Sequence, residues 1–308
     1  MKILITGGAG YIGTELIKKL ISDKSVNEII VYDNLYKGSY SLFTHPTIGG
    51  NNIRLVQADI LDTRMLRKVL HGVDIVYHLA ARIQPPFAEV DPHFFEQVNH
   101  WGTAELSYAI EDTASIRKVV HISSTSVYGS SGREQITEEA IPNPKTNYAI
   151  SKLRGEGFMQ RLMDKKNVVI LRVGNVYGFS HSMRFDAVIN RFAFEANFIK
   201  RLNINGNGTQ SRAFIHIDAL SDGLAKLSSL SVPSGIYNYV ANNYSVMDIA
   251  MSLKELLPNI EMLFINQHLK LRDLQVVTDG PIYQYLPKEP STLKLELIEL
   301  INQFAFHP

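Results

Sequence analysis

The sequence "KILITGGAGYIGTELIKKL", residues 2–20, decides the fold. It begins as a short apolar run, passes through a glycine-rich turn and continues with apolar residues at helical spacing. Gly7, Gly10 and Gly13 are three residues apart, and residues without a Cβ let a ligand approach the backbone closely. The N-terminus of the following helix would offer its N–H groups to a pyrophosphate. The stretch therefore predicts the strand, turn and helix of a dinucleotide-binding fold.

The same alternation of apolar runs and amphipathic segments continues through the first half of the chain. Buried strands are predicted at residues 2–6, 28–33, 53–59, 74–80, 118–123 and 168–173. Helices are predicted between them at 11–21, 63–71, 92–112 and 146–165. This pattern indicates an α/β protein with a Rossmann-like, doubly wound parallel sheet and helices on both faces.

The rhythm loosens after residue 173. Residues 1–173 are expected to form one doubly wound, Rossmann-like dinucleotide-binding domain, and residues 174–308 a smaller α/β C-terminal lobe. The segment 211–232 is expected to return to the first domain with a strand and a helix. Further elements are predicted as a helix over 245–257, a strand over 262–265, a loop over 277–292 and a helix over 291–303.

Composition excludes several classes of function. The chain has 308 residues and a net charge of +1, so no charge excess favours a nucleic-acid or membrane partner. It contains no cysteine, which excludes disulfides, cysteine-ligated zinc and cysteine nucleophiles, and no metal site is predicted. The first apolar run breaks at Gly7, too early for a signal peptide, and no run approaches the roughly 20 residues of a membrane span. We expect a cytoplasmic protein.

Acidic residues at strand ends suggest how a dinucleotide would be held. Asp33 ends the second strand, twenty positions after Gly13, where a carboxylate can accept hydrogen bonds from ribose hydroxyls. It would repel a 2′-phosphate, so NAD is favoured over NADP; the alternative is a carboxylate that only caps the turn. Asp59 ends the third strand and is equally suited to an adenine contact or to capping. Small residues in "HLAA", 78–81, would let a cofactor lie against the backbone, although packing alone could also explain them.

A Tyr–Lys pair follows the fifth strand. In "NYAISK", residues 147–152, Tyr148 and Lys152 are four positions apart and so share one helix face. Such a pair can equally be part of a solvated surface. However, the hydroxyl-rich "SSTSVYG", 123–129, ends the preceding strand, at the sheet edge where doubly wound folds bind ligands. The glycine-rich turn, the hydroxyl-rich stretch and the Tyr–Lys pair together favour the interpretation in which the Lys152 ammonium controls the proton of the Tyr148 phenol.

With these residues in view, the chain resembles the extended short-chain dehydrogenase/reductase family, specifically its NAD-dependent nucleotide-sugar epimerases and dehydratases, and is most similar to the UDP-glucose 4-epimerase type. Further matching motifs are "YDN", "ADI", "VNHWGT" (98–103), "LRVGNVYG" (171–178) and "GTQSRAFIHID" (208–218). The resemblance implies that Tyr148 is the general base and that Ser124 hydrogen-bonds the reacting oxygen. It also implies that the Lys152 ammonium binds the nicotinamide ribose and, with the nicotinamide ring, lowers the pKa of the phenol from about 10.

The resemblance also assigns binding residues. The implied cofactor contacts are Gly7, Gly10, Tyr11, Ile12, Gly13, Asp33, Asn34, Asp59, Ile60, Leu79, Ala80, Ala81, Asn99, Tyr148 and Lys152. The implied substrate contacts are Ser124, Asn175, Arg212 and Arg272. Asn175 and Arg212 would contact the diphosphate, for which a guanidinium is well suited. Arg272 directly precedes Asp273, unlike the family pattern, so the two could equally be an exposed ion pair. His181 is assigned no role.

The residues before "VYG" discriminate between reactions within the resembled family. A 4,6-dehydratase would have Asp-Glu there, a decarboxylase a Glu, and 3,5-epimerase types a Cys; this chain has Thr125 and Ser126. The pattern favours a nucleotide-sugar 4-epimerase, in which hydride leaves C4 for NAD and returns to the opposite face of a 4-keto sugar. One alternative is a 4-ketoreductase or dehydrogenase with the same triad of Ser124, Tyr148 and Lys152. A less favoured alternative is a non-enzymatic dinucleotide-binding protein. A homodimer built by helices 92–112 and 146–165 is implied, while the nucleotide and the sugar stay open.

Overall fold

The computed structural model describes residues 1–38, 40–46, 48–49, 52–83, 91–132, 134–268 and 271–306. The strands are β1 Lys2–Thr6, β2 Glu28–Asp33, β3 Ile53–Gln57, β4 Ile75–His78, β5 Lys118–Ser124, β6 Asn167–Val173, β7 Asn175–Tyr177, β8 Arg201–Asn205, β9 Ser211–His216, β10 Gly235–Tyr239, β11 Asn242–Ser245 and β12 Glu261–Ile265. The α-helices are α1 Tyr11–Leu20, α2 Thr63–Val69, α3 Pro92–Phe95, α4 Gly102–Glu111, α5 Asn147–Leu162, α6 Val188–Phe194, α7 Ile217–Lys226, α8 Val246–Leu256 and α9 Leu293–Asn302. Short 3₁₀ and π segments are η1 Ser41–Thr44, η2 Glu96–Trp101, η3 Thr125–Tyr128, η4 Glu195–Ile199 and η5 Pro281–Gln284.

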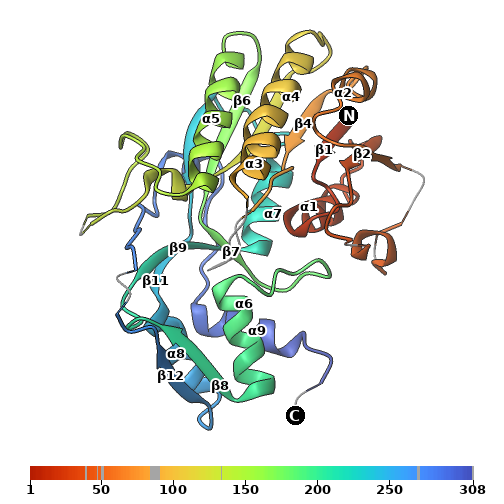
Figure 1. The fold of residues 1–308 in the computed structure, drawn as a ribbon. Helices are drawn as coiled ribbons and strands as arrows, with labels where there is room; N and C mark the ends of the chain where they lie inside the picture. The colour runs from red at the N-terminus through yellow and green to blue at the C-terminus, as the bar shows by residue number, and fades with distance from the viewer. Residues whose placement is uncertain are drawn as a thin grey trace.

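A seven-stranded sheet forms the core of the larger part of the molecule, the upper part in Figure 1. Its order is β10-β6-β5-β4-β1-β2-β3, and every strand pair is parallel. Helices α1 and α7 pack together on one face, and apolar residues of α2, α4 and α5 cover the other. Burial on both faces explains why the strands are nearly continuous apolar runs. The predicted doubly wound α/β class is confirmed.

The order of the strands reverses between β1 and β4, and ligands of doubly wound sheets bind at such a switch point. The glycine-rich turn after β1, the "HLAA" segment after β4 and the serines after β5 all lie at the carboxyl edge of this sheet. The sheet therefore brings three separate motifs of the sequence to one place.

The smaller lobe contains two short sheets, β11-β9-β7 and β12-β8, with α6, α8 and α9 sharing one apolar core with them (Figure 1). Within the segment 211–232, α7 packs on α1 of the large domain, whereas β9 pairs with β7 and β11. The strand that returns to the large sheet is β10, beyond residue 232. Its sequence "GIYNY" contains Gly and Asn, so the sequence pattern does not predict it. Where the chain divides into domains stays a prediction.

The predicted helix over 92–112 is interrupted. It consists of α3, the π-helical η2 and α4, and Asn99 lies in the π-helical part. Helix α5 packs directly on this turn: a Cβ at Gly155 would lie 2.6 Å from the carbonyl oxygen of Asn99. Single π-turns often occur at functional sites. No helix in the described ranges has the length and apolar character needed to cross a membrane.

Candidate active site

A cleft of about 1090 Å³ separates the carboxyl edge of the large sheet from the smaller lobe. Its lining includes the glycine-rich turn, Asp33, Ser124, Tyr148 and Lys152 from the large domain. From the other side it includes Asn175, Arg212 and Arg272. The cleft therefore joins most of the predicted cofactor and substrate residues, which extend along the chain from Gly7 to Arg272.

The turn after β1 packs so closely against neighbouring backbone that it requires glycine at two positions. Gly7 has a φ of 70°, and a Cβ there would lie 2.6 Å from backbone atoms of Ala80. A Cβ at Gly13 would lie 2.5 Å from the carbonyl oxygen of Gly8. Gly10 caps α1 without any side-chain hydrogen bond, which leaves the helix N-terminus accessible to an anion. These residues fit the pyrophosphate of a dinucleotide.

Asp33 fixes this turn and faces the cleft at the same time. Its two carboxylate oxygens accept hydrogen bonds from the N–H groups of Ala9, at 3.0 Å, and Leu35, at 2.9 Å. A carboxylate has about four acceptor positions, so two are left for ribose hydroxyls. Asp59 similarly accepts bonds from Asn34, at 2.9 Å, and from the N–H of Leu61, at 3.0 Å. Asp33 can therefore cap the turn and bind ribose hydroxyls at the same time at the carboxyl edge of the sheet.

The predicted triad comes from the end of β5 and the first turns of α5. The Thr146 side chain accepts a hydrogen bond from the N–H of Ala149 and so starts α5 just before Tyr148. Lys152 is 4% exposed, and its ammonium donates to the carbonyl oxygen of Ile122. Tyr148 and Lys152 therefore share one face of α5, next to the end of β5.

The pKa values of Tyr148 and Lys152 agree only in part with those expected from the sequence. Burial raises the pKa of Tyr148 above its ordinary value, and the opposing influences are a hydrogen bond with Ser124 and the charge of Arg184. Burial lowers the pKa of Lys152 to about 8, against the opposing charge of Glu156. The Ser124 contact agrees with the predicted relay. The charge that opposes burial at the phenol is that of Arg184, whereas the sequence interpretation gave this role to Lys152 and the nicotinamide ring.

Arg184 is a cleft residue that sequence reasoning missed. It lies between β7 and α6, and its guanidinium binds Asp186 through two hydrogen bonds of 3.1 and 2.6 Å. Burial raises the pKa of Asp186, but the bond and charge of Arg184 outweigh it, so the net pKa lies below the ordinary value. The signal in the sequence was "MRFDA", 183–187, shortly after "NVYG".

Apart from Ser124, the predicted substrate residues lie on the side of the cleft formed by the smaller lobe. Asn175 donates to the carbonyl oxygen of Ala213 at 3.0 Å. Burial lowers the pKa of Arg212, which the charge of Asp273 raises and that of Arg272 lowers, so these three groups are near one another. The carboxylate of Asp273 accepts the N–H of Ser211 at 2.5 Å. It is thus held by backbone and does not form a simple exposed pair with Arg272.

Asn99 lies behind the wall of the cleft. Its amide accepts the N–H of Arg82 at 2.7 Å and donates to the carbonyl oxygen of Arg82, at 2.9 Å, and to Ser151, at 3.0 Å. Ser151 in turn donates to the carbonyl oxygen of Tyr148 at 2.8 Å. Asn99 therefore links the loop after β4 to the start of α5, and its predicted contact with the cofactor stays a prediction.

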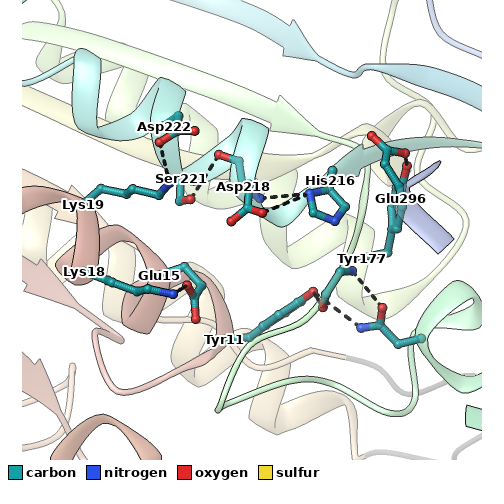
Figure 2. Close-up of polar contacts among 12 residues, drawn as sticks. Tyr11, Glu15, Lys18, Lys19, Tyr177, His216, Asp218, Ser221, Asp222 and Glu296 are labelled. Carbon is teal, nitrogen blue, oxygen red and sulfur yellow. Dashed lines mark hydrogen bonds and ion pairs between the residues drawn. The ribbon is translucent and has the colours of Figure 1, made fainter. Parts of the chain in front are cut away.

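Tyr11 of the glycine-rich turn reaches across to the other lobe (Figure 2). Its hydroxyl donates to the carbonyl oxygen of Gly178 at 2.6 Å, and the amide of Asn190 accepts the N–H of Gly178 at 2.9 Å. Nearby, Tyr177 of β7 donates to Glu296 of α9. The cofactor side of the cleft is thereby joined to the segment that carries Arg184.

Comparison with known proteins decides the family. The model of the "NAD dependent epimerase/dehydratase family" matches residues 3–238. The chain belongs to the NAD dependent epimerase/dehydratase family. Its members use NAD, which agrees with the glycine-rich turn and Asp33.

Relatives of this epimerase/dehydratase chain include both reaction types. Human dTDP-D-glucose 4,6-dehydratase is 32% identical over 83% of this chain and 74% of its own length. The UDP-glucose 4-epimerase of Mycolicibacterium smegmatis is 30% identical over 73% of this chain and 72% of its own length. Among solved structures, UDP-glucuronic acid 4-epimerase from Bacillus cereus, in complex with UDP-glucuronic acid and NAD, superimposes with a TM-score of 0.85. It is 26% identical and covers 98% of both chains.

Proposed function

We propose that this family member is an NAD-dependent nucleotide-sugar 4-epimerase. The observation that carries the proposal is the pair Thr125 and Ser126 at the start of η3, next to Ser124. A dehydratase needs a carboxylic acid and a carboxylate at this place, and hydroxyl groups cannot take those roles near pH 7. The Ser126 hydroxyl is buried and has no hydrogen-bond partner within the described residues, and Ser126 belongs to the lining of the cleft.

The other carboxylates of the cleft do not replace the missing acid. Among the described residues that line it, these are Asp33, Asp59 and Asp186. Asp33 and Asp59 lie at the ends of β2 and β3 and bind backbone N–H groups. Asp186 is held by Arg184 with a lowered pKa, so it stays ionised and cannot donate a proton near neutral pH. The cleft is thus suited to a reaction in which one group takes up and returns a single proton.

The triad is suited to that proton transfer. Bound NAD supplies the acceptor and the donor of the hydride. Tyr148 would take the proton of the sugar 4-hydroxyl through Ser124 and later return it to the other epimer. Lys152 would hold the nicotinamide ribose, while Arg212, Arg272 and Asn175 would hold the diphosphate so that the sugar can turn between the two hydride transfers.

The test begins with the cofactor. The chain is purified without added nucleotide and denatured, and the released NAD is measured; about one per chain is expected for a cofactor retained through a complete cycle. Nucleotide sugars with UDP, GDP, dTDP and CDP, glucose and glucuronic acid forms included, are then incubated with the protein in D₂O and analysed by NMR. An epimerase gives the 4-epimer without deuterium in the sugar.

Other results would assign another reaction. A 4,6-dehydratase removes the C5 proton, so a 4-keto-6-deoxy product carrying deuterium would refute the proposal in its favour. An NAD-free chain that binds NADPH more tightly than NADH would indicate a 4-ketoreductase. Replacement Tyr148→Phe should abolish turnover and leave the bound NAD unchanged. The matched control Tyr40→Phe alters an exposed tyrosine outside the cleft lining and should leave both unchanged.

A further inference from the structure

A buried ion pair lies directly beneath the triad. Glu156 is one helical turn after Lys152 on α5 and is wholly buried, and Arg172 of β6 is 3% exposed. The guanidinium donates to both carboxylate oxygens, at 3.0 and 2.7 Å. The Ser123 hydroxyl donates to the same carboxylate at 2.5 Å. A buried carboxylate needs such a set of donors, because leaving it unpaired is costly.

The end of β5 is tied to α5 at three successive residues. The carbonyl oxygen of Ile122 accepts the Lys152 ammonium, the side chain of Ser123 binds Glu156, and Ser124 lies near enough to Tyr148 to lower the pKa of its phenol. Successive side chains of a strand point to opposite sides. The bond from Ser123 to Glu156 therefore fixes how β5 is rotated about its own axis between Ile122, which contacts Lys152, and Ser124, which lies near Tyr148. Glu156 also has a rigid anchor of its own in Arg172.

We propose that Glu156 and Ser123 are positioning residues of the active site: the bond between them holds the end of β5 against α5, so that Ser124 meets Tyr148 and Ile122 meets Lys152. Neither side chain needs to touch the substrate for this role. The inference rests on the proposed function of the triad, and extends it to Ser123 in the cleft wall and to Glu156 beneath it.

Charge supports the same assignment. The ionisable groups around Lys152 are His78 of β4, His121 of β5 and Glu156 of its own helix. Burial and the Lys152 charge lower the pKa of both histidines, that of His78 to about 3, so both rings are neutral near pH 7. Glu156 is therefore the neighbour whose charge favours the ammonium. At Tyr148 the charge that contributes is that of Arg184 from the opposite lobe, and Lys152 lies one turn along α5.

The experiment compares Ser123→Ala with Ser107→Ala in the chain as purified with its NAD. Ser107 is also buried and bonds α5, at the carbonyl oxygen of Phe158, but has no link to the triad. In Ser123→Ala the ion pair stays, so the fold is retained, and we expect kcat to fall about five- to tenfold with little change in KM. Ser107→Ala should keep both constants.

A second readout needs no substrate. Phenolate formation at Tyr148 is titrated by absorbance near 295 nm, as the difference between each protein and its Tyr148→Phe counterpart. The Ser124 bond lowers the pKa of Tyr148, so a displaced Ser124 in Ser123→Ala should raise it, whereas Ser107→Ala should not. Unchanged kcat and unchanged titration in Ser123→Ala would overturn the proposal. If no nucleotide sugar is turned over by the unaltered chain, the proposed function fails, and the titration alone decides the positioning role.

Discussion

The hydroxyl of Tyr11 and the carbonyl oxygen of Gly178 are 2.6 Å apart, and this bond joins the helix of the cofactor turn to the substrate side of the cleft. The hydroxyl is buried, and burial raises the pKa of Tyr11 well above its ordinary value, so it remains a donor at all working pH values. The segment after Gly178 carries Arg184 and Asp186. Binding on one side of the cleft is thereby connected to the geometry of the other.

Replacement Tyr11→Phe should weaken this connection. It leaves the Gly178 carbonyl without its buried donor, so we expect a loss of about 1–2 kcal/mol in the free energy of unfolding, measured in urea. The KM for the nucleotide sugar should also rise. Tyr237→Phe is the matched control, because its hydroxyl donates to Pro233 within one domain. A similar loss of stability without any change in KM is expected there; an unchanged KM in Tyr11→Phe would refute the coupling.

Alkaline pH should affect activity and stability in opposite directions. The pKa of Lys152 is lowered by burial to about 8 in the folded chain, whereas an unfolded lysine has a pKa of about 10.4. Between these values the unfolded state binds more protons, so this group makes the NAD-free chain more stable as pH rises. Turnover should instead fall through about pH 8 as the ammonium is lost.

The matched variant for this prediction is Lys152→Met. It should remove the rise in unfolding free energy between about pH 8 and 10, measured in parallel urea titrations, because it has no proton to lose. A rise of equal size in Lys152→Met would show that other groups cause it.

The Glu156–Arg172 pair should dominate the stability of the large domain near α5. Glu156→Ala leaves the Arg172 guanidinium buried without its partner, and breaking a buried pair in this way typically costs about 3–5 kcal/mol. The double replacement Glu156→Ala/Arg172→Met removes both charges and should recover a substantial part of that loss. Thermal unfolding of the three proteins tests this. Equal melting temperatures for the single variant and the unaltered chain would contradict it.

The cation at Arg212 should act on substrate binding and not on cofactor binding. We expect Arg212→Gln to raise the KM of the nucleotide sugar roughly 10- to 100-fold, the effect of losing a charged hydrogen bond to a phosphate. The NAD content should be unchanged. Arg67→Gln removes an exposed guanidinium paired with Asp112, and should alter neither. A loss of NAD in Arg212→Gln would place the substrate diphosphate elsewhere.

The glycine-rich turn, Asp33 and the apolar strands were sufficient to predict the doubly wound fold and its use of NAD, because each depends on a local pattern. Spacing alone puts Tyr148 and Lys152 on one face of a helix, and burial on both faces makes strands such as β1 and β6 continuous apolar runs. The sequence by itself thus determined the fold class and the use of NAD, and it predicted the residues of the triad.

Tertiary structure decided what depends on distant segments. Three features had no local signal in the sequence. These are the return of β10 to the large sheet, the π-turn that holds Asn99 and the hydrogen bond from Tyr11 to Gly178. The same is true of charge: Arg184 influences the Tyr148 phenol, and Glu156 the Lys152 ammonium, only because folding excludes water between elements and brings these groups together. A pKa depends on burial and on neighbours in space, and neither can be counted along a sequence.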